Sequence, residues 1–312
     1  MRIGYAALAS FSFAIASPAS ALSNRDFDCT STRVGEAGSV VIKTTLGETP
    51  ALVRIPSKIG RSPIVLWHGF GPPASEQALM EALPLDDVPA VKVYLGLPLF
   101  GARAPAGGSN ELARRQQEDL ATLVFEPAVM GAAKELPAVV RALEERNCLK
   151  RGERIGLFGF SAGGAAVFYA LAERDVRIGA AVTLNASTGL SASVNAYERA
   201  TKGSYNWTGA ARRLAQRSDA AGRAKDIATG HPPPALLIIH GNDDAMLTPE
   251  VASTLHSALL PAYREALATE QLQLLLVPGL AHGWTSSGSQ EALRSSIAAW
   301  FHNYLWPAGS TR

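Results

Sequence analysis

The sequence predicts an α/β protein with a mostly parallel, eight-stranded sheet flanked by helices. Short apolar runs alternate with helical patterns along most of the chain, and several of these runs are apolar throughout, as in strands buried on both faces. The composition agrees, because 47% of the 312 residues are hydrophobic and 18% are charged, which suits a folded domain with a sizeable core.

The sheet begins with a predicted hairpin. Residues 39–47 and 51–56 are rich in β-branched side chains and enclose a short turn. Residues 63–70 (PIVLWHGF) form a continuous apolar run, which predicts a strand buried on both faces. A helix is expected over residues 75–83, where Pro84 ends it.

The middle of the chain is expected to be mainly helical. Residues 91–98 read as the next strand, and the glycine- and proline-rich residues 99–110 as a surface loop. The pattern from 111 to 147 is helical, with breaks expected at Pro127 and Pro137 because proline lacks a backbone donor.

Four further apolar runs complete the predicted sheet. They cover residues 154–160, 178–186, 235–242 and 272–280. Residues 289–305 then form a closing helix.

One connection is too long for an ordinary loop. Residues 190–230, between the sixth and seventh strands, are polar and helix-forming. We expect a small helical insertion there, within a single domain of residues 22–312. It is a candidate lid over the carboxyl edge of the sheet.

The N-terminus has the pattern of a secretory signal peptide over residues 1–21. Arg2 precedes an apolar run, and Ala19-Ser20-Ala21 matches an A-x-A cleavage site. A membrane anchor is the alternative, but the run is shorter than the ~20 residues that a span needs. The mature protein is therefore expected to be secreted or periplasmic, with no stable membrane anchor.

The two cysteines, Cys29 and Cys148, allow two interpretations. In an exported protein they can form a disulfide, whereas two separate buried thiols would behave as small hydrophobic side chains. The spacing leaves both open.

The charge and the spacing of possible ligand residues argue against a nucleic-acid partner, a metal and a cofactor. The net charge is +2 with no basic tract, so no nucleic-acid partner is predicted. His240, Asp243 and Asp244 have no third well-spaced cluster to complete a metal site, so neither metal nor cofactor is expected. The sequence indicates no particular oligomeric state.

Ser161 lies in residues 159–163 (GFSAG), after a predicted strand and before a predicted helix. This is the context of a nucleophile elbow, in which glycines two residues before and after the serine permit a tight turn. A glycine- and serine-rich connecting turn is the alternative. The elbow interpretation predicts that Ser161 is a catalytic nucleophile.

Such a serine needs a base and an acid. His282 follows the last predicted strand, where its imidazole could reach the carboxyl edge of the sheet. Asp243 and Asp244 follow a buried strand at the same edge, and one of them could orient the imidazole. Asp also favours turns, which is the alternative for this pair. The order Ser, Asp, His along the chain favours a triad.

Two loops could bind the negative charge that develops on a substrate oxygen. Ala162 offers the N–H that follows the nucleophile, and Phe70 offers another from the loop after the third strand. His68 is expected to brace this loop. Trp284, Tyr205 and Trp207 are candidate walls of a substrate pocket, although aromatic residues in loops are as often ordinary packing.

These residues resemble the α/β-hydrolase superfamily, in particular its dienelactone-hydrolase-like and prolyl-oligopeptidase-like esterases, over residues 40–305. The resemblance implies a triad of Ser161, Asp244 and His282. It also implies an oxyanion hole formed by the N–H groups of Phe70 and Ala162.

Asp244 is implied because the family form is His-Gly, two residues, then Asp. Here His240-Gly241 precede it, but Pro249 comes one residue later than usual, which keeps Asp243 as an alternative.

The resemblance implies a secreted serine esterase acting on a small-molecule carboxylic ester. Dienelactone hydrolases proper use cysteine, so a serine nucleophile favours a carboxylesterase. A peptidase with the same triad is the second hypothesis, disfavoured because this sequence shows no propeller that would screen peptides. A non-catalytic binding protein on the same fold is the third.

Overall fold

The computed structural model describes residues 27–35, 38–285, 288–305 and 307. Its eight strands form one sheet in the order β1-β2-β4-β3-β5-β6-β7-β8. β2 runs antiparallel to both β1 and β4, and all other neighbours are parallel. The predicted mostly parallel eight-stranded sheet is thereby confirmed. The predicted signal peptide, residues 1–21, lies outside the described residues.

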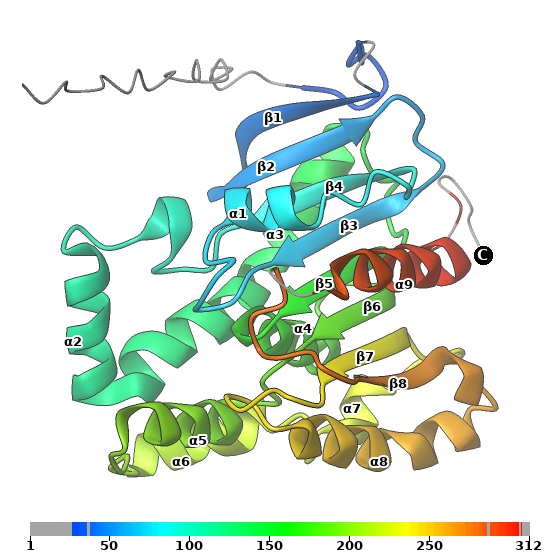
Figure 1. Ribbon diagram of the computed structural model, residues 1–312. Coiled ribbons are helices and arrows are strands. Elements are labelled where there is room, and N and C mark those ends of the chain that lie inside the picture. Colours follow the sequence, from blue (N-terminus) through cyan, green and yellow to red (C-terminus); the bar gives the residue numbers. More distant parts are fainter. Residues whose placement is uncertain (1–26, 36–37, 286–287, 306, 308–312) are drawn as a thin grey trace, which may run out of the picture.

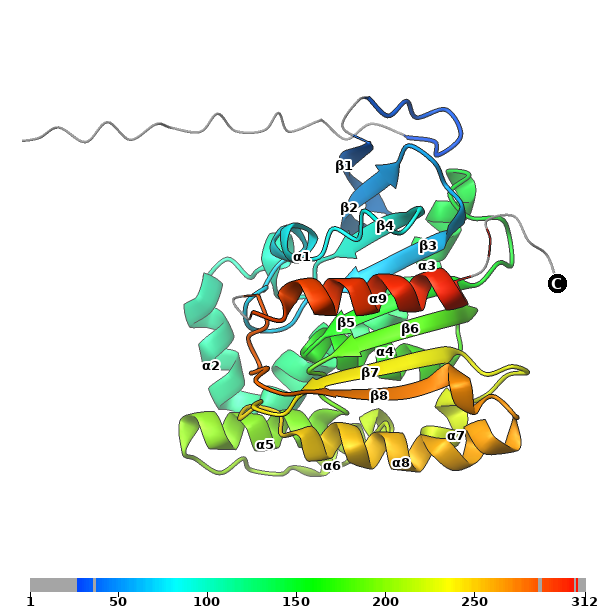
Figure 2. The ribbon, with the colours of Figure 1, turned by 45° about the vertical axis from the view of Figure 1, so that its right-hand side comes forward.

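The elements follow one another as the sequence predicts, with strands and helices alternating after the first hairpin (Figures 1 and 2). The strands are β1 (Ser39–Leu46), β2 (Thr49–Pro56), β3 (Arg61–Trp67), β4 (Ala90–Leu95), β5 (Ile155–Phe160), β6 (Ile178–Leu184), β7 (Ala235–Gly241) and β8 (Leu272–Val277). The α-helices are α1 (Glu76–Ala82), α2 (Gly108–Leu120), α3 (Gly131–Glu145), α4 (Ala162–Glu173), α5 (Leu190–Thr201), α6 (Gly209–Ser218), α7 (Ala224–Ile227), α8 (Pro249–Glu265) and α9 (Gln290–Tyr304). The remaining elements are the 3₁₀-helices η1 (Gly101–Arg103) and η3 (Thr269–Gln271) and the π-helix η2 (Ala121–Met130).

Helices cover both faces of the sheet. The apolar side chains of α1 and α9 pack on one face, and those of α3, α4 and α8 pack on the other. Every residue of β4, β5, β6 and β7 is consequently buried, which explains why these strands are mainly apolar. The carboxyl ends of β3, β5 and β6 point toward the side where α2, α5 and α6 lie (Figure 1).

The long helical region breaks at Asp119 and not, as expected, at the two prolines. The backbone of Asp119 is extended (φ −161°, ψ 96°), and its side chain accepts a hydrogen bond from the N–H of Ala121. It thereby caps the π-helical η2, which contains Pro127, while α3 runs through Pro137. Burial of the apolar residues of η2 and α3 outweighs the hydrogen bond that each proline removes.

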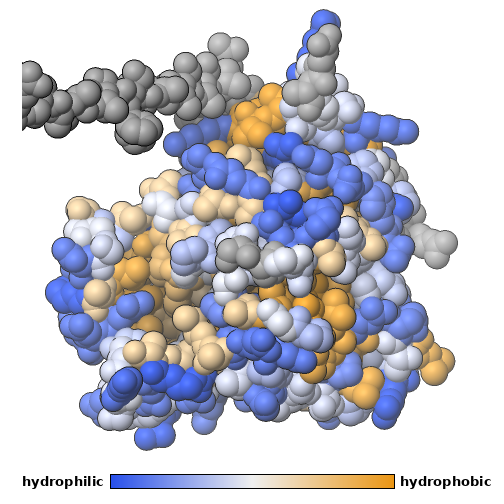
Figure 3. Space-filling view, in the orientation of Figure 1, coloured by the Kyte–Doolittle hydropathy of each residue, from blue (hydrophilic) through white to orange (hydrophobic). Residues whose placement is uncertain are grey.

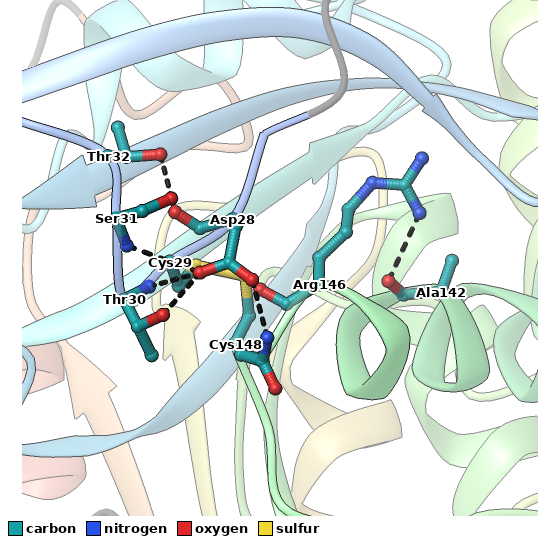
Figure 4. The surroundings of a disulfide bond; sticks show 9 residues. Asp28, Cys29, Thr30, Ser31, Thr32, Ala142, Arg146 and Cys148 are labelled. Carbon is teal, nitrogen blue, oxygen red and sulfur yellow. Dashed lines mark hydrogen bonds between the residues drawn. A yellow bond between two sulfur atoms is a disulfide. The ribbon is translucent and has the colours of Figure 1, made fainter.

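A disulfide joins Cys29 to Cys148 across 119 positions of the chain. The N–H of Cys29 also donates to Arg146 O (2.9 Å), and Asp28 accepts hydrogen bonds from Thr30 and from the side chain of Asn147 (Figure 4). Of the two interpretations of the cysteines, the structure has the disulfide. It ties the N-terminal segment to the turn between α3 and β5.

Removal of this disulfide is expected to lower the free energy of unfolding by about 2–5 kcal/mol, because the unfolded chain regains the freedom of a long loop. The Cys29→Ser/Cys148→Ser double variant avoids leaving a free thiol. Urea unfolding of the oxidised protein and of this variant measures the difference. Coincident curves would contradict the prediction.

The segment of residues 190–230 contains three helices, as an insertion should. α5 and α6 lie at the carboxyl edge of the sheet, whereas Ala224 and Ile227 of α7 are buried in the core shared with α4 and α8. Its role as a lid remains a prediction. Within the described residues, no helix is long and apolar enough to cross a membrane.

Candidate active site

Ser161 occupies a strained turn between β5 and α4. Its backbone has φ 54° and ψ −116°, a conformation that costs a residue other than glycine about 1–3 kcal/mol. The turn is also crowded. A Cβ on Gly159 would lie 2.3 Å from Gly163 O, and a Cβ on Gly163 would lie 2.5 Å from His68 O. Glycine is therefore required at both positions, as the G-x-S-x-G spacing predicts.

The variant Gly163→Ala should lose about 1–3 kcal/mol of stability, since its new methyl group meets backbone oxygens that cannot swing aside. Gly71→Ala is the matched control, because a Cβ there has no neighbour within 4 Å. Thermal unfolding of the two variants measures the contrast. Equal melting temperatures would show that the turn adapts to the methyl group.

His282 lies between Ser161 and Asp244. Its Nε2 is 3.0 Å from Ser161 Oγ, and its Nδ1 is 2.8 Å from Asp244 Oδ2. The histidine follows β8 and the aspartate follows β7, so three strand ends deliver three side chains to one edge. Asp243 is exposed and, among the described residues, forms no hydrogen bond or ion pair with His282, so Asp244 is the acid that the structure pairs with this base.

Hydrogen bonds keep Asp244 ionised although it is buried. Burial alone would raise the pKa of this carboxyl, but hydrogen bonds from His240, His282 and the N–H of Leu247 hold that pKa well below its usual range. Oδ1 accepts from the N–H groups of Met246 (2.9 Å) and Leu247 (2.8 Å). A fixed negative charge beside Nδ1 favours an imidazole that takes up a proton at Nε2.

The loop after β3 lies directly against Ser161. A Cβ on Gly69 would be only 2.9 Å from the Cβ of Ser161, so the backbone of this loop borders the serine. Among the described residues, the N–H groups of Phe70 and Ala162 donate to no protein acceptor. Phe70 stacks on Phe100 at 4.7 Å between ring centroids, which fixes the loop from its other side.

His68 holds this loop from beneath. Its Nδ1 donates to Gly69 O (2.6 Å), and its Nε2 accepts from the N–H of Leu97 (3.0 Å). Burial lowers the pKa of His68 to about 4, so the ring is neutral at ordinary pH. These contacts agree with the expected bracing role.

The expectation that Trp284 contacts substrate is wrong. Its ring is fully buried and packs edge-on against Phe160 at 6.3 Å, in the core beneath α9. The chain turns inward directly after His282, because burying the large apolar indole is more favourable than leaving it at the edge of the sheet.

Tyr205 and Trp207 contact each other, and Tyr205 also contacts the break in α2. Their rings meet edge-to-face at 5.2 Å, and the hydroxyl of Tyr205 donates to Asp119 Oδ1 (2.5 Å). These contacts tie the loop between α5 and α6 to α2. Contact of either ring with substrate remains a prediction.

A cavity of about 400 Å³ borders His282. Its walls are formed by α5, by the loop after β7 and by the loop that carries the histidine. The lining residues are Ala196, Arg199, Ala200, Asp243, Ala245, Met246, Ala281, His282 and Gly283. In the orientation of Figure 1, apolar side chains also gather in the hollow beside α2 (Figure 3).

The sequence did not predict that two buried polar residues, His240 and Asn185, contact the groups of this site. The Nε2 of His240 lies 3.4 Å from Asp244 Oδ2 and 2.6 Å from Leu247 O. Asn185 directly follows β6 and bonds the loop of His282. A polar residue at the end of an apolar strand is the signal that could have identified Asn185. Within the described part of the chain, no three His, Cys, Asp or Glu residues form a group that could hold a metal ion.

Comparison with known proteins places this chain among hydrolases. A model of the prolyl oligopeptidase family matches residues 131–307, more than half of the chain. A search of curated proteins returned no match.

Solved structures share the fold at low sequence identity. A Thermus thermophilus protein is 19% identical, with a TM-score of 0.65 over 85% of this chain and 97% of that one. A Pyrococcus furiosus esterase is 13% identical, with a TM-score of 0.56 over 86% and 92%. A dienelactone hydrolase from Anabaena variabilis is 19% identical, with a TM-score of 0.51 over 86% and 98%.

Proposed function

Because this chain belongs to the prolyl oligopeptidase family of hydrolases, we propose that it cleaves carboxylic esters through an acyl-enzyme intermediate on Ser161. The single observation that carries the proposal is the chain of contacts from Ser161 Oγ to His282 Nε2 (3.0 Å) and from His282 Nδ1 to Asp244 Oδ2 (2.8 Å). A serine hydroxyl is a weak nucleophile, and this arrangement activates it.

In the acylation half, Ser161 Oγ attacks the carbonyl carbon of the ester while its proton passes to His282 Nε2. The carbonyl electrons move onto the oxygen, which becomes an oxyanion. When the tetrahedral intermediate collapses, the bond to the alcohol oxygen breaks. The alcohol leaves with the proton from His282, and the acyl group stays on Ser161.

In the deacylation half, a water molecule takes the place of the alcohol. It loses a proton to His282 as its oxygen attacks the acyl carbon, and a second collapse releases the carboxylic acid. The proton returns from His282 to Ser161 Oγ. Asp244 stays ionised throughout and stabilises the protonated imidazole.

The N–H groups of Phe70 and Ala162 are proposed to bind the oxyanion. Ala162 follows Ser161 in the chain, and Phe70 follows Gly69, whose backbone borders Ser161. Neither N–H has a protein acceptor among the described residues, which leaves both available to a substrate oxygen. Ala162 is in addition the first residue of α4, where the helix dipole favours negative charge.

A fluorophosphonate reagent tests the nucleophile, and paired substrates test the bond that is cleaved. Covalent labelling should fall on the peptide that contains Ser161, and short aryl esters should be hydrolysed much faster than the matching aryl amides. The names of two structural neighbours, an esterase and a dienelactone hydrolase, support the ester. Faster hydrolysis of the amides would favour a peptidase. An unlabelled Ser161 would favour a non-catalytic protein.

We further propose that the protein is secreted or periplasmic, with residues 1–21 removed. The signal pattern of the sequence supports this, and so does a disulfide, a bond that persists in oxidising compartments. Sequencing the N-terminus of the exported protein tests it, and a mature chain that begins at Leu22 is expected.

A further inference from the structure

Asn185 is a fully buried amide at the centre of the site, in a backbone conformation that few residues adopt. It follows β6 directly, is 0% exposed and has φ 45°. Asparagine tolerates positive φ better than most residues other than glycine. A buried polar side chain in this conformation has to be explained by the bonds that it makes.

The side chain of Asn185 bonds the loop of the base to the strand of the acid. Its Nδ2 donates to Ala281 O (2.9 Å) and to His282 O (3.0 Å), and its Oδ1 accepts from the N–H of Gly241 (2.8 Å). These bonds use both donors and the acceptor of the amide. No other side chain of this size offers two donors and an acceptor in one plane.

The backbone around Asn185 also holds the serine. The N–H of Ser161 donates to Leu184 O (3.0 Å), and Ser161 O accepts from the N–H of Ser187 (3.1 Å). The N–H of Asn185 itself donates to Ile239 O (2.9 Å), in the strand that leads to Asp244. The segment 184–187 thus bonds the backbones that carry the nucleophile, the acid and the base.

We propose that Asn185 is a positioning residue, which sets the distance between His282 and Ser161 by fixing the backbone of His282. This inference rests on the triad proposed above. Loss of the two donors frees the carbonyls of Ala281 and His282, and the imidazole then shifts relative to Ser161. A shift of about 1 Å can reduce the rate of a positioned reaction roughly 100-fold.

Two variants test the proposal. Asn185→Asp keeps an acceptor for Gly241 but places oxygen in the position of the donors. Asn185→Gly removes the side chain and leaves room for water. Because glycine adopts a positive φ without strain, this variant should fold even if Asn185→Asp does not. The matched control is Asn242→Asp, the same chemical change at an exposed position.

For a folded variant we expect kcat on a short aryl ester to fall about 10- to 100-fold, with KM within threefold of the unmodified protein. The rate at which a fluorophosphonate labels Ser161 should fall by a similar factor, because labelling needs the same base. Asn242→Asp should leave both rates unchanged. Kinetics and labelling within twofold of the unmodified protein, or a loss confined to KM, would overturn the proposal.

Labelling separates this inference from the proposed function. If the protein is labelled but hydrolyses no ester, the ester proposal fails, and the labelling rates of the Asn185 variants still test the positioning role. If the unmodified protein is not labelled, the proposed triad is wrong, and the proposed role of Asn185 is then wrong as well.

Discussion

Replacement of Ser161 by alanine is expected to lower kcat/KM on a short aryl ester by ~10⁴-fold or more, because Ser161 is the described residue whose hydroxyl bonds the Nε2 of His282. The residual rate would come from binding and from the proposed oxyanion donors. Steady-state hydrolysis and fluorophosphonate labelling, compared with the unmodified protein, measure the loss.

The fold of the Ser161→Ala variant should survive. The side chain of Ser161 has one hydrogen-bond partner in the described structure, the Nε2 of His282, and that imidazole is partly exposed to solvent, so water can replace the lost hydroxyl. Alanine at φ 54° keeps the strain that serine already bears. An unchanged melting temperature with lost activity is the expected pair of results. Retained activity would place the nucleophile elsewhere.

The second large effect is expected at Asp244. Asp244→Asn should lower kcat by about 10³- to 10⁴-fold near neutral pH, because an amide can neither balance the imidazolium charge nor accept the Nδ1–H in the same way. The asparagine Oδ1 can still accept from the N–H groups of Met246 and Leu247, which protects the loop. Measurement of kcat between pH 6 and pH 9 records the loss.

The control for Asp244→Asn is the same substitution at the neighbouring residue, Asp243→Asn. Asp243 is exposed and lies on the wall of the cavity beside His282, so Asp243→Asn should change kcat less than threefold. If Asp243→Asn is the costlier of the two substitutions, the late position of Pro249 has moved the role of the acid by one residue. The pairing of Asp244 with His282 would then not be the catalytic one.

Local sequence patterns predicted the strands and the elbow, because both depend on neighbours in the chain. Strands buried on both faces need apolar residues throughout, and a serine at a tight turn needs glycines beside it. The placement of His282 and of the pair Asp243 and Asp244 at one edge followed from a general property of parallel sheets, whose carboxyl strand ends meet there. The preference for Asp244 over Asp243 followed from the resemblance to the α/β-hydrolase superfamily.

Features that depend on distant contacts were less predictable. The direction of Trp284 depends on the core beneath α9, and its place beside His282 in the sequence wrongly suggested the pocket. The helices run through Pro127 and Pro137 because η2 and α3 pack in the core, which local proline rules ignore. Asn185 gains its importance from Gly241, Ala281 and His282, all of which are far from it in the chain.

The brace at His68 has a consequence for experiments in acid. A proton on its Nε2 would replace the bond to the N–H of Leu97 by a clash of two donors, but burial delays this step to a pH of about 4. Above that pH the loop that carries the Phe70 N–H keeps its geometry. A reversible loss of rate in moderately acidic buffer would therefore not come from protonation of His68. An irreversible loss near pH 4 would mark the point at which the loop itself gives way.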